Sequence, residues 1–290
     1  MSKGRVICED ISHGQSVYPI PIVNDVDDEN LDPFFQYIQY NVDDRDISDR
    51  DMDGRVLGVT DLHTKFYDSV LYECDEATCK CAGKCSNRMT PLKFNLRVEL
   101  FRTTYAGFGV RSRQYIPSGT FVAEFVGEIL NLNEAYHRPN PEDYSYQVVN
   151  QHSSDGHYVD PTRYGNISRF FNHSCFENLL PIQFFSAHRD VKRASIGFVA
   201  FRDILPGQEL TIDYGPTWWE RIVKREDFFY CQCDWVYCIN PAPGKVQHSA
   251  EEAKKLIIKI CRENNEKIRD YELSKHVGLV KVPRRPPAES

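Results

Sequence analysis

The chain has 290 residues, of which 41% are hydrophobic and 27% charged, and its formal net charge at pH 7 is −7. These values are typical of a globular protein with a buried core. The acidic balance disfavours direct, sequence-specific nucleic-acid binding and favours a basic partner. The sequence contains no run of about 18 apolar residues and opens without an apolar signal segment, so we expect neither a membrane span nor secretion. Ten cysteines in a reducing compartment then indicate metal binding rather than disulfides.

Two stretches stand out before residue 90. Residues 25–53 carry much of the acid, which is typical of a solvated surface loop; the alternative is a surface that binds a basic partner. Residues 74–85 read CDEATCKCAGKC, with cysteines at positions 74, 79, 81 and 85. Four thiolates at this spacing can bind one Zn²⁺ or form half of a larger cluster, and the alternative is a loop of reduced cysteines without metal.

The middle of the chain has the composition of short strands. Residues 96–103, 120–130 and 195–204 are rich in aromatic and β-branched residues and partly alternate between apolar and polar. Residues 116–119 and 205–208 contain the Pro and Gly of tight turns. Because turns rather than helices separate these strands, the sequence predicts a mostly β core.

Helical signals appear in the last quarter of the chain. Residues 217–220, TWWE, have the pattern of a capping box, which predicts a short helix through Lys224. Residues 249–252, SAEE, begin a longer predicted helix with Leu256, Ile257 and Ile260 on one face. The tail from Val282 is expected to be frayed.

A second cysteine group lies near the C-terminus. Cys231, Cys233 and Cys238 are spaced C-x-C-x4-C, and three such thiolates can occupy three corners of a tetrahedral Zn²⁺ site. The fourth ligand must then come from elsewhere in the chain, and Cys175, which has no neighbouring cysteine, is one candidate. The alternative is a set of reduced cysteines in the core.

Four motifs occur in a fixed order, and each is weak when taken alone. They are a G-x-G turn in YAGFGVR (105–111), RFFNHSC (169–175), ELTIDYG (209–215) and the C-terminal cysteine group. Together they resemble the SET-domain protein lysine methyltransferases. With the cysteines of 74–85 and the stretch 7–27, they are similar to the subgroup with pre-SET and post-SET segments that methylates lysine 9 of histone H3, in its euchromatic branch.

The resemblance implies a fold and a division of the chain. The fold would be mostly β, with several small sheets and a knot-like threading. Residues 1–90 would be a pre-SET-like segment with an incomplete cysteine set, 91–215 the SET domain, 216–247 the post-SET zinc segment, and 248–290 a C-terminal helix and tail.

The resemblance also implies roles for individual residues. Tyr214 and Tyr146 match the catalytic positions, and the methyl donor would be S-adenosylmethionine. The residues that match its binding site are Gly107, Phe108, Gly109, Tyr146, Arg169, Phe170, Asn172 and His173. Phe125, Val148, Ile212 and Trp218 match the walls of the lysine pocket. Cys175, Cys231, Cys233 and Cys238 match the post-SET zinc site, and Cys74, Cys79, Cys81 and Cys85 would hold at most one further zinc.

The chemistry of methyl transfer suits these residue types. The reaction is an in-line displacement on a sulfonium, so alignment and electrostatics supply the rate and no nucleophilic side chain is needed. A lysine in water is neutral in only about one molecule in 10³ to 10⁴ at pH 7. A desolvated aromatic channel favours the neutral amine, and tyrosine hydroxyls can orient it.

The sequence departs from the subgroup in its pre-SET cysteines, in its lysine pocket and at a position that reads the substrate. Residues 28–70 contain no cysteine, so the three-zinc cluster of the subgroup's pre-SET segment cannot form. In the lysine pocket, Phe125 stands where close relatives have tyrosine, and Ile212 and Val148 replace aromatic residues. Less bulk and fewer hydroxyls predict that di- or trimethylation is tolerated. Val149 takes an acidic position used in substrate reading, which leaves the choice of lysine open.

The implied partner is the tail of histone H3 or another basic protein tail, and the implied location is chromatin in the nucleus. An alternative from a different class is a catalytically weak SET scaffold, or a chromatin component that binds a histone tail. A zinc module that binds nucleic acid is disfavoured by the acidic balance.

Overall fold

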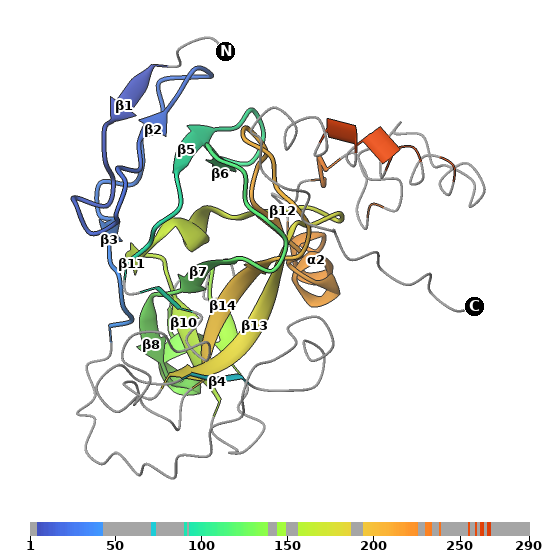
Figure 1. Ribbon diagram of the computed structural model, residues 1–290. Coiled ribbons are helices and arrows are strands. Elements are labelled where there is room, and N and C mark those ends of the chain that lie inside the picture. The colour runs from blue at the N-terminus through green and yellow to red at the C-terminus, as the bar shows by residue number, and fades with distance from the viewer. Residues whose placement is uncertain are drawn as a thin grey trace.

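Short strands in several small sheets make up the fold (Figure 1). The computed structural model describes residues 5–42, 71–73, 90–91, 93–138, 144–148, 156–186, 194–225, 230–233 and 238, together with residues 255, 259, 262, 263, 266 and 267. Five sheets lie within these ranges. The predicted mostly β core is confirmed, and no helix in the described ranges is long and apolar enough to cross a membrane.

The first sheet joins the N-terminal segment to the middle of the chain. Its strand order is β1 (Val6–Cys8), β2 (Ile22–Val23), β5 (Val98–Arg102) and β6 (Phe108–Ser112). β2 runs parallel to β5, with Ile22 opposite Leu100 and Val23 opposite Phe101. The strand predicted at 96–103 is therefore confirmed as β5, which lies beside a strand from far earlier in the sequence.

The second large sheet contains the most deeply buried strand. Its order is β4 (Leu71–Glu73), β13 (Leu179–Ser186), β14 (Ser195–Ala200) and β7 (Phe121–Phe125). Every residue of β14 is buried, and the Phe198 ring packs edge-on against Phe125 and Phe171. β14 confirms the strand predicted at 195–204. β13 was not predicted, since exposed Pro181 interrupts its apolar run.

The stretch predicted as one strand at 120–130 forms two strands in different sheets. β7 ends at Phe125, and β8 (Glu128–Leu130) pairs with β10 (His157–Asp160). Gly127 lies between the two strands and packs closely against the backbone of Asp160. A Cβ at this position would lie 2.4 Å from the backbone oxygen of Asp160, so only glycine permits this approach. At this break the chain leaves the sheet of β7 and enters the sheet of β8.

Three smaller pairings complete the core. β9 (Tyr146–Val148) extends the β8–β10 sheet, β3 (Gln36–Tyr37) runs parallel to β11 (Tyr164–Gly165), and β12 (Asn172–His173) runs parallel to β15 (Thr211–Ile212). Helix α1 (Leu132–Tyr136) and the 3-10 helix η1 (Ile167–Phe170) connect them. The knot-like threading stays a prediction.

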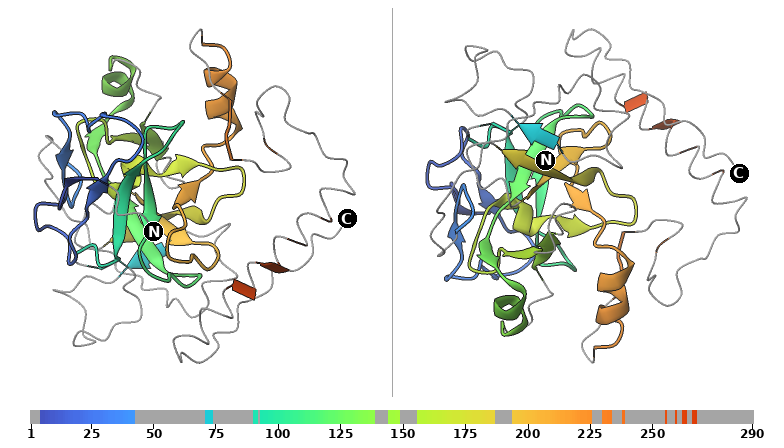
Figure 2. Two further views of the ribbon diagram at one scale, coloured as in Figure 1. Left: turned by 90° about the horizontal axis from the view of Figure 1, so that it is seen from above. Right: turned by 90° about the horizontal axis from the view of Figure 1, so that it is seen from below.

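Helix α2 (Pro216–Ile222) lies at the edge of the sheets, drawn in orange in both views of Figure 2. The capping box predicted at 217–220 is wrong. The helix begins earlier, with Gly215 as its N-cap at φ 83° and Pro216 in its first turn, so Thr217 lies inside the helix. Lys255, Lys259 and the other described residues of the C-terminal segment are helical, whereas Leu256, Ile257 and Ile260 lie outside the described residues.

Candidate active site

The pairing of β12 with β15 brings two distant motifs side by side. Asn172 lies opposite Thr211 and His173 opposite Ile212. The hydroxyl of Tyr214 donates a hydrogen bond of 2.9 Å to the carbonyl oxygen of Phe171. RFFNHSC and ELTIDYG therefore meet in one place, as an active site built from both would require.

The G-x-G turn packs directly against this pair. A Cβ on Gly109 would lie 2.8 Å from Asn172 Nδ2 and 2.4 Å from Glu209 Oε1, so glycine is needed for the close approach. Asn172 Nδ2 donates to Glu209 Oε1 at 2.8 Å and to the carbonyl oxygen of Phe108 at 3.4 Å. Gly107 has φ 68°, which glycine adopts without strain. The G-x-G turn and Asn172 therefore pack directly against each other.

Glu209 is a site residue that sequence reasoning missed. Its carboxylate lies below Gly109 and holds the amide of Asn172. Burial raises the pKa of this carboxyl, and the hydrogen bond from Asn172 opposes that shift. The available signal was its place at the start of ELTIDYG, where a carboxylate precedes a buried strand.

Arg169 lies among aromatic rings. Its guanidinium carbon is 4.4 Å from the ring centre of Tyr144, 5.1 Å from that of Phe170 and 5.3 Å from that of Phe35. Its Nε atom is buried without a hydrogen-bond partner among the described residues. A buried donor of this kind is available to an anionic group. Tyr144, to which the sequence analysis assigned no role, also contacts Arg169.

Aromatic residues surround the position matched to the lysine pocket. The ring of Phe125 lies 5.9 Å from that of Tyr146, and the Tyr214 ring lies 4.7 Å from that of Trp218. Burial raises the pKa of both tyrosine hydroxyls, so they stay protonated at neutral pH. Phe125 lies in the main hydrophobic core with Tyr146 and Tyr214 packed against it, whereas Trp218 packs against the smaller cluster of Trp219, Ile222 and Cys231.

Val148 and Ile212, the two aliphatic residues matched to the pocket walls, are buried as Phe125 is. Both belong to the main hydrophobic core, with exposures of 0% and 9%. Phe125 and Ile212 are buried in the same cluster, against which Tyr146 and Tyr214 are partly packed. The role of these residues as pocket walls stays a prediction.

The four cysteines matched to the post-SET site form a cluster. The Sγ atoms of Cys175, Cys231, Cys233 and Cys238 all lie within 4.8 Å of one another, and Cys175 Sγ is 4.0 Å from Cys231 Sγ and 3.9 Å from Cys238 Sγ. A tetrahedral zinc with sulfur ligands at about 2.3 Å separates its sulfurs by about 3.8 Å. The donor set and spacing fit a metal ion. Cys74, Cys79, Cys81 and Cys85 lie outside the described residues.

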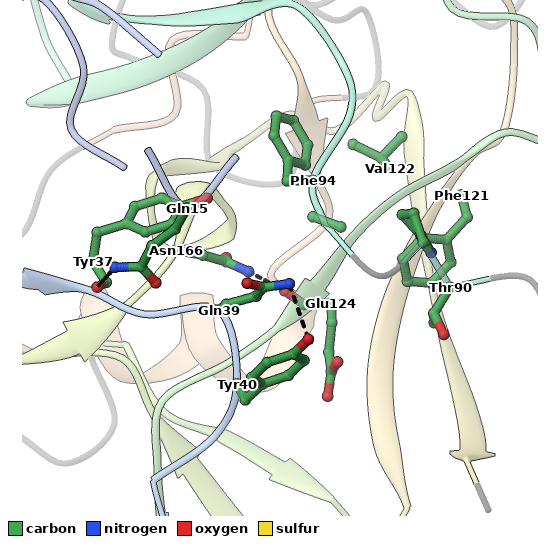
Figure 3. Close-up of a pocket in the computed structure, with 12 residues that line it drawn as sticks. Gln15, Tyr37, Gln39, Tyr40, Thr90, Phe94, Phe121, Val122, Glu124 and Asn166 are labelled. Atoms are coloured by element: carbon green, nitrogen blue, oxygen red, sulfur yellow. Dashed lines mark hydrogen bonds between the residues drawn. The ribbon is translucent and has the colours of Figure 1, made fainter. Parts of the chain in front are cut away.

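A cavity lies apart from this site, between the N-terminal segment and β7 (Figure 3). Tyr37 and Phe94 line it, together with Glu124, whose buried carboxylate accepts a hydrogen bond from Asn41 Nδ2 at 3.4 Å. Asn166 closes one side and donates to the backbone oxygen of Glu124 at 2.8 Å. None of the predicted site residues is among the described residues that line it.

Comparison with known proteins identifies the class. The SET domain family matches residues 107–215, which contain the G-x-G turn, RFFNHSC and ELTIDYG. The match identifies residues 107–215 of this chain as a SET domain.

Within that class it is similar to the human histone-lysine N-methyltransferase EHMT1, with 33% identity over an alignment of 281 positions that covers 86% of this chain and 21% of the relative. The chain thus spans about a fifth of that relative's length.

Two solved structures have the same fold. One is KRYPTONITE in complex with mCHH DNA, an H3(1–15) peptide and SAH, with a TM-score of 0.63 and 27% identity over 83% of this chain and 54% of that one. The other is SUVH6 of Arabidopsis thaliana in complex with SAM, with a TM-score of 0.64 and 27% identity over 83% of this chain and 56% of that one.

Proposed function

We propose that this protein is an S-adenosylmethionine-dependent histone-lysine N-methyltransferase. The observation that carries the proposal is the β12–β15 pairing, which puts the Tyr214 hydroxyl on the carbonyl of Phe171, next to Asn172 and the G-x-G turn. The relatives named above support it, since one is a histone-lysine N-methyltransferase and the two solved neighbours contain SAM or SAH.

The residues of the site fit S-adenosylmethionine, which when bound supplies a methyl group on a sulfonium. Gly109 lets the turn lie against Asn172 and Glu209, and Glu209 orients the amide of Asn172 that would contact the cofactor. The orphaned Nε–H of Arg169 is a donor suited to a carboxylate. These residues would hold the donor, and Phe108, Phe170, His173 and Tyr146 complete the proposed set.

The tyrosines would prepare the acceptor amine. Because the Tyr214 hydroxyl donates its proton to Phe171, its oxygen remains an acceptor that can orient an amine N–H. The rings of Phe125, Tyr146 and Trp218 exclude water around it and so favour the neutral amine. Alignment of that amine is the main contribution of these side chains.

The substrate we propose is lysine 9 of histone H3, with di- or trimethylation tolerated. The net charge of −7 suits a basic tail. A relative from Arabidopsis thaliana, SUVH5, is named H3 lysine-9 specific, and the KRYPTONITE structure holds an H3 peptide. A nuclear, chromatin-associated location follows from that substrate.

The cysteine cluster completes the proposal as a zinc site. Four thiolates at tetrahedral spacing are the ligand set of structural zinc. We place it in a post-SET segment of residues 216–247, after a SET domain of 91–215 and a pre-SET-like segment of 1–90, and before a C-terminal helix and tail of 248–290. A second zinc at Cys74, Cys79, Cys81 and Cys85 is part of the same proposal.

The experiment is a radiolabelled methyl-transfer assay on histone H3 peptides, in which each lysine is replaced in turn. We expect transfer that is lost when lysine 9 is replaced, and loss on all peptides for Tyr214→Phe. Transfer that persists without lysine 9 would contradict lysine 9 as the substrate but not the methyltransferase activity. Binding of S-adenosylhomocysteine without transfer to any histone would contradict the enzyme and favour a scaffold.

A further inference from the structure

An ion pair joins the N-terminal segment to Arg102, the last residue of β5, which lies beside the G-x-G turn. Arg102 Nε donates to Asp27 Oδ2 at 2.8 Å, and the two side chains are 22% and 34% exposed. The contact follows from the sheet: β2 lies parallel to β5 with Val23 opposite Phe101, so the loop after β2 runs beside the end of β5. Figure 1 shows β2 next to β5, with β6 on the far side of β5.

Asp27 is held in place before it meets the arginine. Its Oδ1 accepts hydrogen bonds from Asn24 Nδ2 at 2.9 Å and from the backbone N–H of Glu29 at 3.1 Å. Asn24 is itself 2% exposed, and its Oδ1 accepts from the backbone N–H groups of Val26 and Asp27. The hydrogen bond from Asn24, more than the contact with Arg102, lowers the pKa of Asp27. The carboxylate is therefore ionised and pointed in one direction.

Arg102 lies over the turn that would receive the cofactor. Its Nη1 atom is 3.6 Å from where a Cβ on Gly107 would be, and its guanidinium carbon is 5.5 Å from the ring centre of Phe108. Thr103 closes the turn from the other side, since its N–H and its hydroxyl donate to the carbonyl oxygen of Gly107 at 2.8 and 2.9 Å. Arg102 thus packs on a turn in which Thr103 already holds the carbonyl group of Gly107.

We propose that Asp27 and Arg102 are positioning residues for the cofactor turn. Asp27 fixes the guanidinium, and the guanidinium holds Gly107 and Phe108 in the conformation that binds the methyl donor. The inference rests on the proposed function and assigns a part in cofactor binding to the N-terminal segment, which lies outside residues 107–215.

The decisive variant is Asp27→Asn in the full chain. Its Oδ1 can still accept from Asn24 and Glu29, but an amide nitrogen would face Arg102 Nε, so two donors would meet. We expect the affinity for S-adenosylhomocysteine, measured by isothermal titration calorimetry, to fall about fivefold, as for the loss of a partly exposed ion pair. KM for S-adenosylmethionine should rise by a similar factor while kcat changes little.

The matched control is Asp28→Asn, which removes the neighbouring pair with Arg5. Arg5 Nη1 donates to Asp28 Oδ1 at 2.9 Å, a distance close to that of the Asp27–Arg102 pair, but the two side chains are 59% and 94% exposed. We expect its affinity to match that of the wild type. Equal weakening by Asp27→Asn and Asp28→Asn, or none by Asp27→Asn, overturns the proposal.

A second variant distinguishes loss of this contact from misfolding of the protein. Arg102→Gln should weaken binding as Asp27→Asn does, and the double variant should be no weaker than either single one because both act through one contact. Additive losses would contradict the shared mechanism, and thermal unfolding reports whether each variant is folded. A wild-type protein that does not bind S-adenosylhomocysteine would instead contradict the proposed function itself.

Discussion

The imidazole of His173 links the cysteine cluster to Tyr214. Its Nε2 atom lies 3.1 Å from Cys175 Sγ, and its Nδ1 accepts the backbone N–H of Tyr214 at 3.1 Å. Trp219 packs edge-on against the same ring at 5.0 Å. Cys175, a proposed zinc ligand, and Tyr214, the proposed catalytic tyrosine, therefore both contact His173, and we expect loss of the metal to disturb the active site.

Removing one cysteine ligand tests this coupling. For Cys238→Ser we expect the zinc content per chain to fall by one ion and methyl transfer to fall at least about 100-fold, since a displaced ligand also releases the support of His173. Native mass spectrometry and the transfer assay measure the two effects.

Cys8→Ser is the control for that variant, because Cys8 lies in β1 and is not part of the four-thiol group. We expect unchanged zinc and activity. Unchanged zinc in Cys238→Ser would exclude this cluster as the metal site, and full activity in a zinc-depleted variant would remove the proposed coupling.

Tyr214→Phe removes one hydroxyl and keeps the ring. We expect kcat to fall by about 10²-fold or more, since the variant can no longer orient the amine. The carbonyl oxygen of Phe171 loses its hydrogen bond as well, which should lower the free energy of unfolding by about 1–3 kcal/mol. Chemical denaturation and single-turnover kinetics measure the two quantities.

Tyr40→Phe is the matched control for the lost hydroxyl. Tyr40 is 49% exposed and accepts from Gln39 Nε2, away from the site. Its activity should equal that of the wild type. A Tyr214→Phe variant that retains more than about half of the rate would show that orientation by this hydroxyl is not rate-determining.

Phe125 offers a test of the product. It is 6% exposed, and its ring meets Tyr146 at 5.9 Å. Phe125→Tyr adds a hydroxyl that takes up room and can hold water near the amine. We expect the wild type to form di- or trimethyl-lysine and the variant to stop at an earlier stage. Mass spectrometry of an H3 peptide over time resolves the products, with Phe34→Tyr, at a residue 71% exposed, as control.

A wild-type product that ends at monomethyl-lysine would contradict the pocket interpretation, whatever the variant does. An unchanged product distribution in Phe125→Tyr would show that this ring does not limit the acceptor.

The sequence predicted the parts of the site that lie within contiguous motifs. RFFNHSC and ELTIDYG each carry their residues in a fixed order, so their meeting at β12 and β15 could be anticipated. Contacts between residues far apart in the sequence could not be anticipated. Asp27 and Arg102 are 75 residues apart, and the sequence around neither residue indicates the other as its partner.

Two predictions of element boundaries failed, one because of a stronger local signal and one because of a tertiary contact. The TWWE pattern was a plausible helix start, but Gly215 followed by Pro216 begins the helix earlier, because proline presets the first helical φ. The strand predicted at 120–130 was broken by Gly127, whose close approach to Asp160 is a tertiary requirement that no periodicity reveals.

The buried carboxyl of Glu209 makes stability depend on pH. Burial raises its pKa in the folded protein, so its favourable contribution is complete below the unfolded pKa of about 4.5 and is lost as pH rises through the higher folded value. Glu209→Gln keeps an oxygen that can accept from Asn172 and never ionises. The variant should therefore gain stability relative to the wild type as pH rises from 4.5 towards 7, while S-adenosylhomocysteine binding is retained. Urea denaturation at several pH values measures the difference. Glu209→Ala, which leaves the Asn172 amide without this acceptor, should weaken that binding; a stability difference between Glu209→Gln and the wild type that is constant with pH would contradict the raised pKa.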